Sequence, residues 1–232
     1  MTNNDLLIDL DDYLDLSNFS LCTKEFQDKF HLIPDESKST GYFTPDVSIK
    51  DRVDSQTIML RVLKDREDWK DWGLIDKEEK WKDGPLFDLF PNIRAFKSIG
   101  RVFISFTQNK TNIEPHAEFV PNHPKTPPWR QEYLWFSLVG GKKLWATDWE
   151  STLEFYKNGF VVEDKFPKIY SKGISCRFNP IMLHGVECEE DFSASIRIDG
   201  QYTENFRETI LGDREWKTTY EYVDEEGYFN GF

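Results

Sequence analysis

The sequence predicts a mainly β chain with flanking helices (an α+β fold), built around a barrel or sandwich of antiparallel strands. Phe, Trp and Tyr make up 16% of its 232 residues, and many of them stand in short alternating runs, which favours sheet over a helix bundle. After residue 100, strand-like runs recur at roughly ten-residue spacing, as they do in all-β barrels and sandwiches.

The length of the chain favours a single domain, because 232 residues can bury one sizeable core. Neither an internal repeat nor a low-complexity linker divides it. Within this domain we expect a helical and irregular region at about 1–99, a strand-rich core at about 100–202 and a C-terminal extension at about 203–232.

Two helices are expected before the core. Apolar residues stand at helical spacing among the acids of the first twenty residues: Leu6, Leu10, Tyr13 and Leu14. This pattern predicts an acidic amphipathic helix that packs on the core. The highly charged segment 51–83 contains three tryptophans and is interpreted as a solvated helix anchored by them.

Alternation of apolar and polar residues marks the strands of the core. The segment RVFISFTQ at 101–108 alternates as a half-buried strand should. Three more strand candidates follow near the end of the core, at 172–180, 181–188 and 193–202. In the last of them, the apolar face carries Ala194, Ile196 and Ile198, and the polar face carries Ser193, Ser195, Arg197 and Asp199.

Local signals predict how the middle of the core is connected. Gly140 and Gly141 separate two apolar runs, which predicts a β-hairpin. Ser151 stands three residues before Glu154 and Gly159 follows, so a capping box and a glycine stop predict one or two helical turns between them.

Charge and composition exclude several classes of protein. There are 29 Lys and Arg against 42 Asp and Glu, a net charge of −13, so nucleic acid and anionic membranes would meet net repulsion. No apolar run approaches the ~20 residues that span a bilayer, and the N-terminus is acidic where a signal peptide is basic. We therefore expect a cytoplasmic protein, without predicting its oligomeric state.

The cysteines fit the same compartment. Cys22, Cys176 and Cys188 are odd in number and lack the paired spacing of a metal knot. They predict buried, reduced thiols rather than a disulfide framework.

A scarce pair of metal-binding residue types stands at 116–118, in the sequence HAE. In an extended strand, His116 and Glu118 point to the same face, which places an imidazole beside a carboxylate. His184, in the strand candidate 181–188, could stand across from them on a barrel wall. Two histidines and one carboxylate on one face of a metal leave the other positions open, which suits Fe(II) chemistry with oxygen.

Arg197 follows His184 by thirteen residues and lies on the polar face of its strand. A guanidinium on the concave side of a barrel is costly unless it meets an anion. Its fork matches a carboxylate through two parallel hydrogen bonds, so a dicarboxylate co-substrate is the expected occupant.

The motif His-x-acid, a distal histidine after GISCRFNP and an arginine thirteen residues later resembles the Fe(II)- and 2-oxoglutarate-dependent oxygenases. The resemblance covers about residues 100–202. It implies a double-stranded β-helix core, a cupin-like jelly roll, with His116, Glu118 and His184 as iron ligands. It also implies Arg197 as the partner of the distal carboxylate of 2-oxoglutarate, and O₂ as the second co-substrate.

Further site residues follow from the same resemblance. Tyr133, Trp135 and Ser195 are expected in the co-substrate pocket. His123 and Arg130, in the proline-rich loop that follows the HAE motif, are expected at the substrate entrance.

Two positions depart from the family pattern. Glu118 stands where aspartate is usual, and its extra methylene moves the carboxylate outward. Asp199 stands where many members have serine. Beside an anion pocket its charge would be repulsive, so we expect Asp199 to pair with Arg197 or another cation.

The predicted protein is a dioxygenase that hydroxylates a C–H bond and decarboxylates 2-oxoglutarate to succinate. The segments PHAEF and YLWFSLVGGKK are similar to those of amino-acid and aspartyl/asparaginyl hydroxylases, which implies an amino-acid or peptidyl substrate. Three alternatives stay open: a cupin-like module that binds a small molecule, a catalytically impaired descendant of such an oxygenase, and a non-oxidative metal enzyme such as an isomerase.

Overall fold

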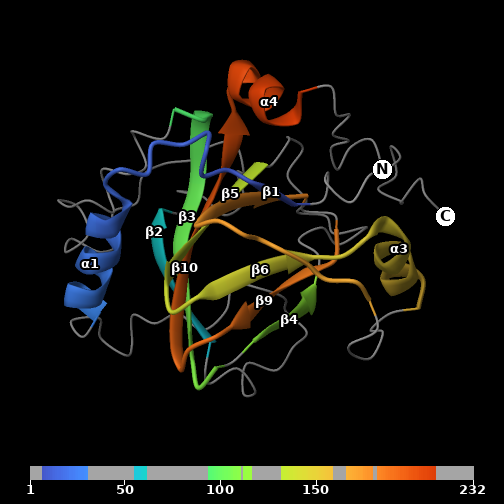
Figure 1. Cartoon of the computed structure of the whole chain (residues 1–232), viewed down its shortest axis with the longest axis horizontal. Helices are drawn as coiled ribbons and strands as arrows, with labels where there is room; N and C mark the ends of the chain where they lie inside the picture. The colour runs from blue at the N-terminus through green and yellow to red at the C-terminus, as the bar shows by residue number, and fades with distance from the viewer. Residues whose placement is uncertain are drawn as a thin grey trace, which may run out of the picture.

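A computed structural model of the chain describes residues 7–30, 55–61, 94–110, 112–116, 132–158, 166–179 and 182–212. This part of the chain is mainly β with few helices (Figure 1). The helices are α1 (Phe19–Phe30), α3 (Trp149–Asn158) and α4 (Glu204–Leu211). The strands are β1 (Leu7–Asp9), β2 (Ser55–Arg61), β3 (Phe96–Gln108), β4 (Ile113–His116), β5 (Glu132–Val139), β6 (Lys142–Ala146), β7 (Ile169–Tyr170), β8 (Ser175–Phe178), β9 (His184–Cys188) and β10 (Phe192–Tyr202).

These strands form two antiparallel sheets. The larger sheet has the order β1-β8-β5-β10-β3-β2, and the smaller sheet has the order β4-β9-β6-β7. From β3 onward the chain moves repeatedly from one sheet to the other, so strands that are distant in sequence become neighbours. The division of the chain into a single domain with a core at about 100–202 stays a prediction.

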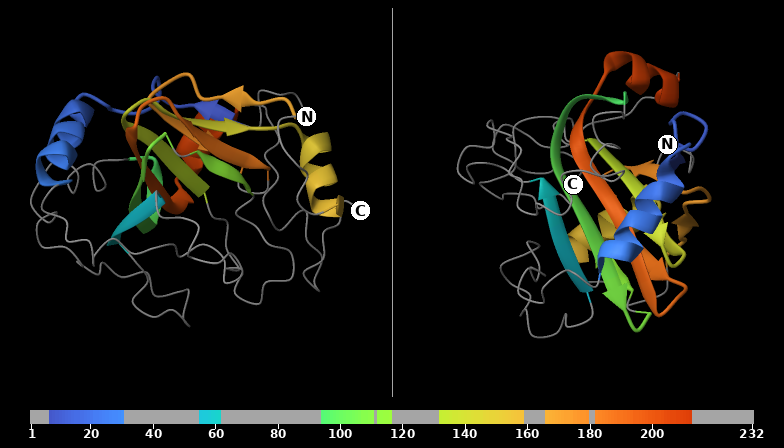
Figure 2. Two further views of the ribbon diagram at one scale, coloured as in Figure 1. Left: turned by 90° about the horizontal axis from the view of Figure 1, so that it is seen from below. Right: turned by 90° about the vertical axis from the view of Figure 1, so that its left-hand side faces the viewer.

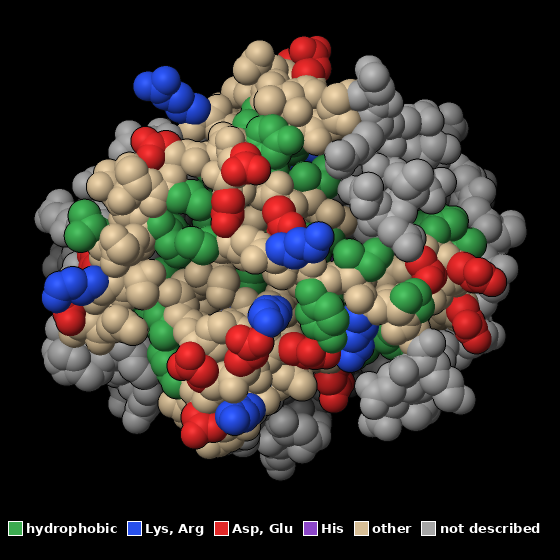
Figure 3. Space-filling view, in the orientation of Figure 1, with side chains coloured by type: hydrophobic (Ala, Val, Ile, Leu, Met, Phe, Trp, Pro, Cys, Tyr) green, Lys and Arg blue, Asp and Glu red, His purple; other side chains and the backbone are tan. Residues whose placement is uncertain are grey.

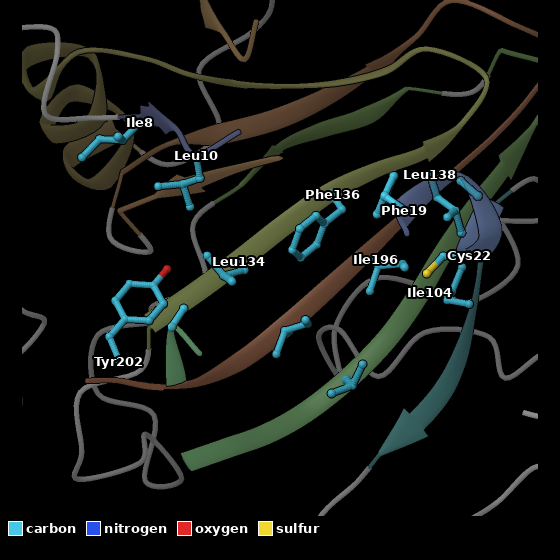
Figure 4. Close-up of a cluster of buried hydrophobic side chains, with 14 of the residues drawn as sticks. Ile8, Leu10, Phe19, Cys22, Ile104, Leu134, Phe136, Leu138, Ile196 and Tyr202 are labelled. Carbon is cyan, nitrogen blue, oxygen red and sulfur yellow. The ribbon is translucent and has the colours of Figure 1, made fainter. Parts of the chain in front are cut away.

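The larger sheet buries apolar side chains on both faces. On its outer face, α1 and α4 share one apolar core with alternate residues of the three central strands. Figure 4 shows part of this core, and the right view of Figure 2 shows α1 lying across the strands. These strand residues are Val102, Ile104, Phe106, Leu134, Phe136, Leu138, Ala194, Ile196 and Ile198. The alternation predicted for β3 and β10 is confirmed, because these alternate side chains belong to one core cluster. The prediction that β3 is half-buried is wrong, because Phe103 and Thr107 on its other face are buried too.

The inner face of the larger sheet packs on the smaller sheet. This inter-sheet core combines Tyr133, Trp135 and Phe178 of the larger sheet with Leu144 and Val186 of the smaller one, among others. The polar residues that alternate with the outer core therefore lie between the sheets. They include Thr107, Ser193, Ser195, Arg197 and Asp199, all buried.

The two glycines after β5 do not close a hairpin. Gly140 and Gly141 both have positive φ, +74° and +61°, as a tight two-residue turn requires. However, β5 pairs with β10 and β8, whereas β6 pairs with β9 and β7. The turn was predicted correctly, but it carries the chain from one sheet to the other.

Replacing Gly140 by alanine should destabilise the fold. The new Cβ would lie 2.0 Å from the carbonyl oxygen of Phe192, and the positive φ alone costs ~1–2 kcal/mol. We expect the melting temperature to fall by several degrees. The control is Gly212→Ala at the end of α4, where φ is +55° but nothing lies within 4 Å of the new Cβ. Equal losses in the two variants, measured by thermal denaturation, would contradict the predicted overlap.

The helix predicted from Leu6, Leu10, Tyr13 and Leu14 is wrong, because residues 7–9 form β1, residues 10–18 are not helical and α1 begins at Phe19. Leu10 is buried in the core and Tyr13 is exposed, so their helical spacing arose without a helix. Leu7 and Ile8 are buried on opposite faces of the larger sheet, so β1 shows no alternation of apolar and polar residues. The carboxylates of Asp9 and Asp11 then accept hydrogen bonds from the backbone N–H groups of Lys172 (2.8 Å) and Ser175 (2.6 Å). These bonds hold the N-terminal segment against the loop before β8.

Two more sequence expectations need correction. β2 lies within the segment interpreted as a solvated helix and pairs with β3; the three tryptophans of that segment lie outside the described residues. α3 begins earlier than the capping box predicted. Asp148, not Ser151, caps it, since its carboxylate accepts a hydrogen bond from the Ser151 N–H at 2.7 Å.

Other findings concern the surface and the thiols. None of the three cysteines is in a disulfide; Cys22 and Cys176 are buried, as predicted, but Cys188 is only half-buried. Within the described ranges, no helix has the length and apolar character that a membrane crossing requires. On the face shown in Figure 3, acidic and basic side chains are interspersed. Lys168 pairs with Glu187 at 2.9 Å.

Candidate metal and anion site between the sheets

Two histidines meet at one end of the smaller sheet. His116 is the last residue of β4 and His184 is the first residue of β9. They are directly opposed in the antiparallel pairing, and their ring centroids lie 4.4 Å apart. The expectation that His184 stands across from His116 is therefore confirmed.

Both imidazoles are held in the same way. The Nδ1 of His116 lies 2.8 Å from the carbonyl oxygen of Glu114, and the Nδ1 of His184 lies 2.8 Å from that of Met182. A carbonyl oxygen can only accept a hydrogen bond, so Nδ1 donates in each pair, and in the neutral ring Nε2 is the nitrogen with the lone pair. Metal-binding histidines are oriented by outer hydrogen bonds of this kind.

The surroundings of His184 fix its ring further. His184 is buried, and its ring centroid lies 4.4 Å from that of Phe178 on β8. Gly185 follows it, and a Cβ there would lie 2.6 Å from the Trp145 ring and 2.8 Å from the Ile113 carbonyl oxygen. Only glycine lets the smaller sheet close this tightly beside His184.

Three predicted site residues lie outside the described residues: Glu118, His123 and Arg130. Within the described ranges, no group of three His, Cys, Asp or Glu side chains could hold a metal ion. The described ligand set thus consists of the two histidines. Glu118 follows His116 by two residues and stays the predicted third ligand.

Arg197 points into the space between the sheets, as its alternation predicted. Its Nε donates a hydrogen bond to Oδ1 of Asp199 at 2.7 Å, and both side chains are more than nine-tenths buried. The expectation that Asp199 pairs with Arg197 is confirmed. The pair brings no net charge to the site.

Aromatic rings surround this ion pair. The guanidinium carbon of Arg197 lies 4.0 Å from the ring centroid of Tyr133, with Phe103 and Phe178 at 5.5 and 5.7 Å. Tyr133 and Phe178 stack with their centroids 5.4 Å apart. Phe178 therefore lies beside both Arg197 and His184, and it connects the predicted anion-binding part of the site with the predicted metal-binding part.

The other predicted pocket residues also face inward. Trp135 is buried in the inter-sheet core and stands opposite Arg197 in the pairing of β5 with β10. The Ser195 hydroxyl lies 3.5 Å from the carbonyl oxygen of Ser105. Both positions are compatible with a pocket between the sheets.

A second buried cation, Lys142, was missed by the sequence interpretation. It lies on the inner face of β6 with Leu144 and Ala146, and it is 1% exposed. Its Nζ donates to the carbonyl oxygen of Ser105 at 3.0 Å and lies 3.4 Å from the Ser105 hydroxyl. The alternation KKLWA was the available signal, because it places Lys142 on the same face as Leu144.

Burial changes the acid–base properties of this lysine. Desolvation lowers the pKa of Lys142 from 10.5 to about 8, and a smaller charge effect of Cys188 raises it. A bound carboxylate would stabilise the charged form. Within the described residues, the oxygens that contact Nζ of Lys142 are neutral. Because its pKa is about 8, Lys142 is positively charged below pH 8.

Comparisons with known proteins identify no family. No protein-family model matches the chain, and the search of curated proteins found no match. Solved structures with a related backbone arrangement include EctD from S. alaskensis with 2-oxoglutarate and 5-hydroxyectoine. It is 13% identical, the match covers 86% of this chain and 73% of that one, and the TM-score is 0.43.

Two further solved structures show that the similar proteins differ in their described functions. An oxidoreductase of the 2OG-Fe(II) oxygenase family from Burkholderia pseudomallei is 12% identical, covers 63% of this chain and 68% of its own, and has a TM-score of 0.39. An HTH_3 family transcriptional regulator from Vibrio cholerae is 10% identical, with coverages of 78% and 64% and a TM-score of 0.32. Structures similar to this chain thus include 2-oxoglutarate oxygenases, at identities and TM-scores too low to assign its activity.

Proposed function

We propose that this protein is an Fe(II)- and 2-oxoglutarate-dependent oxygenase whose site lies between the two sheets. The observation that carries the proposal is the pair of opposed imidazoles, His116 and His184, each with Nδ1 on a carbonyl oxygen. In this arrangement, Nε2 of each ring is the nitrogen that would coordinate the metal, and the buried cations Lys142 and Arg197 face the same space between the sheets. Glu118 is the proposed third ligand.

The order of the strands supports a double-stranded β-helix. Between β3 and β10, the chain alternates between the sheets and all neighbouring strands are antiparallel, as in a jelly roll. In such a barrel, side chains from distant segments converge on one interior. This arrangement accounts for the contact between β4 and β9, which are separated by about 70 residues in sequence.

The donor set fits the proposed metal. Two imidazoles and one carboxylate on one face suit Fe(II) and leave positions for a chelating acid and O₂. Fe(II) and 2-oxoglutarate bound there would supply the oxidising chemistry, with succinate and CO₂ as co-products. The protein contributes fixed imidazole orientations, through the Glu114 and Met182 carbonyl groups, and an interior lined by Phe178, Tyr133 and Leu144 that excludes water.

Two cations could hold the far carboxylate of 2-oxoglutarate. Arg197 is the partner expected from the sequence, but Asp199 offsets its charge at 2.7 Å. Lys142 contacts the neutral carbonyl and hydroxyl oxygens of Ser105. A bound carboxylate would form a stronger, charge-assisted hydrogen bond with the amine than these neutral oxygens do. Electrostatics therefore favour Lys142 as the principal anchor, and Arg197 as part of the pocket wall.

The direct test of the function is turnover. The purified chain, supplied with Fe(II) and 2-oxoglutarate in air, should release succinate, and an amino-acid or peptide substrate should increase the rate. Loss of succinate release on addition of an iron chelator is part of the expected result. Binding of 2-oxoglutarate without any succinate, in protein that retains stoichiometric iron, would instead favour the cupin-like binding module.

The two candidate anchors can be separated by substitution. Lys142→Met should raise the 2-oxoglutarate concentration for half-maximal succinate release about 10- to 100-fold, the value of a charge-assisted hydrogen bond. Lys143→Met is the matched control, because Lys143 is exposed and pairs with Glu189; it should leave this concentration unchanged. Arg197→Lys keeps a positive charge beside Asp199. If it raises the 2-oxoglutarate concentration for half-maximal succinate release more than Lys142→Met does, Arg197 is the principal anchor.

The same lysine variant should change stability in the opposite direction. Holding Lys142 charged with a pKa of about 8 instead of 10.5 costs the folded state roughly 3 kcal/mol. This cost is complete below pH 8 and fades as pH approaches 10.5, because only the unfolded chain then keeps the proton. Lys142→Met should therefore raise the melting temperature most below pH 8, and the gain should shrink towards pH 10.5.

A further inference from the structure

Lys142 and Cys188 form a directly opposed pair on neighbouring strands. They are Cα partners in the antiparallel pairing of β6 with β9. Directly opposed residues project to the same face, with Cβ atoms about 4.5–5.5 Å apart. Both side chains reach the same strand of the larger sheet: Lys142 Nζ contacts Ser105, and Cys188 Sγ lies 3.1 Å from the Thr107 hydroxyl.

Cys188 differs from the other two cysteines in its access to solvent. Cys22 and Cys176 are fully buried, and burial raises the pKa of the Cys176 thiol well above its usual value. Cys188 is half-buried and lines a surface hollow of about 580 Å³. A small oxidant can therefore reach Cys188 more easily than the other two thiols.

We propose that Cys188 and Lys142 are an oxidation-sensitive pair, which hydrogen peroxide joins through a covalent sulfur–nitrogen bond. In the first step, the thiol sulfur loses two electrons to peroxide and becomes a sulfenic acid, with release of one water. In the second step, the neutral amine of Lys142 attacks that sulfur. The S–O bond breaks, the hydroxide leaves with one amine proton as water, and a sulfenamide remains.

The lysine is suited to the second step. Its amine attacks only when it is neutral, and burial lowers the pKa of Lys142 to about 8, so that roughly a tenth of it is neutral at pH 7. The oxygens that meet this amine belong to Ser105 of β3, which does not titrate in this range, and Cys188 of β9 is its titratable neighbour. The yield of the bond should rise between pH 7 and 9.

The bond would act on the proposed site. A sulfenamide removes the positive charge of Lys142, the principal anchor proposed for the far carboxylate. Its effect on 2-oxoglutarate binding therefore rests on the proposed function. The bond itself does not, because it is detected by mass without any turnover.

The test is peptide mass spectrometry on the full chain after brief treatment with hydrogen peroxide, removal of peroxide with catalase and digestion without reductant. We expect a cross-linked product that joins the peptides containing residues 142 and 188. Its mass should be about 2 Da below their sum, and dithiothreitol should release both peptides.

Two variants should abolish the product, and one should not. Cys188→Ser removes the sulfur, and Lys142→Arg keeps the charge but removes the nucleophilic amine. Lys143→Arg, on the exposed face of the same strand, should leave the yield unchanged. The proposal fails if Cys188 is oxidised to sulfinic acid while Lys142 stays unmodified, or if the cross-link persists in Lys142→Arg.

Discussion

Replacing His184 by alanine should abolish Fe(II) binding and succinate release together. His184 supplies one of the two opposed imidazoles, and its orientation is fixed by the Met182 carbonyl group and by the Phe178 ring. With one imidazole and one carboxylate left, the site would keep two of three proposed ligands. We expect an affinity loss beyond the 10- to 100-fold that is typical of outer-shell changes, measured by anaerobic Fe(II) titration.

The controls separate loss of a ligand from loss of folding. His184→Gln keeps much of the side-chain volume against Phe178 and should also lose the metal, while circular dichroism stays unchanged. His31→Ala removes a histidine that the proposed site does not use, and it should bind iron like the unaltered chain. Retained succinate release in His184→Ala would contradict the proposed ligand role.

Replacing Asp199 by alanine should destabilise the protein by about 3–5 kcal/mol, because it leaves the Arg197 guanidinium buried without its carboxylate. Both partners are more than nine-tenths buried, and the hydrogen bond between them is 2.7 Å long. The flanking rings of Tyr133 and Phe103 offset only part of this loss. Urea denaturation should show the loss as a lower midpoint.

An exposed ion pair provides the comparison. Glu204 pairs with Arg207 on α4, but its side chain is 83% exposed. Glu204→Gln should therefore cost less than about 1 kcal/mol. A double variant that replaces Arg197 by Met and Asp199 by Leu should recover much of the loss, since apolar residues fill such positions well. Equal losses in the free energy of unfolding for Asp199→Ala and Glu204→Gln would contradict the larger contribution expected of the buried pair.

Much of the strand-rich core could be predicted from alternation alone. In β3 and β10, period-two patterns separated the residues under α1 and α4 from those between the sheets, because each face has a different environment. Where both faces are buried, the signal failed. Leu7 and Ile8 face the two different cores, so β1 shows no alternation and was not predicted as a strand.

The site could be predicted only in part, for a related reason. His116 and His184 were found because histidine is rare in this sequence and both stand in or beside strand-like segments, and Arg197 was found because it lies on the polar face of a strand thirteen residues after His184. Lys142 was not found, since lysines are common and the turn before it was interpreted as a hairpin. Recognising that Gly140 and Gly141 carry the chain between the sheets would have placed Lys142 in the space between them.

The third ligand is the part of the account that a structure of the metal complex tests most directly. Anaerobic crystals soaked with Mn(II), as a redox-stable substitute for Fe(II), and 2-oxoglutarate should give one anomalous-difference peak within bonding distance of Nε2 of His116, Nε2 of His184 and a carboxylate oxygen of Glu118. A peak elsewhere, no peak, or a Glu118 carboxylate turned away from the two imidazoles would contradict the proposed iron site.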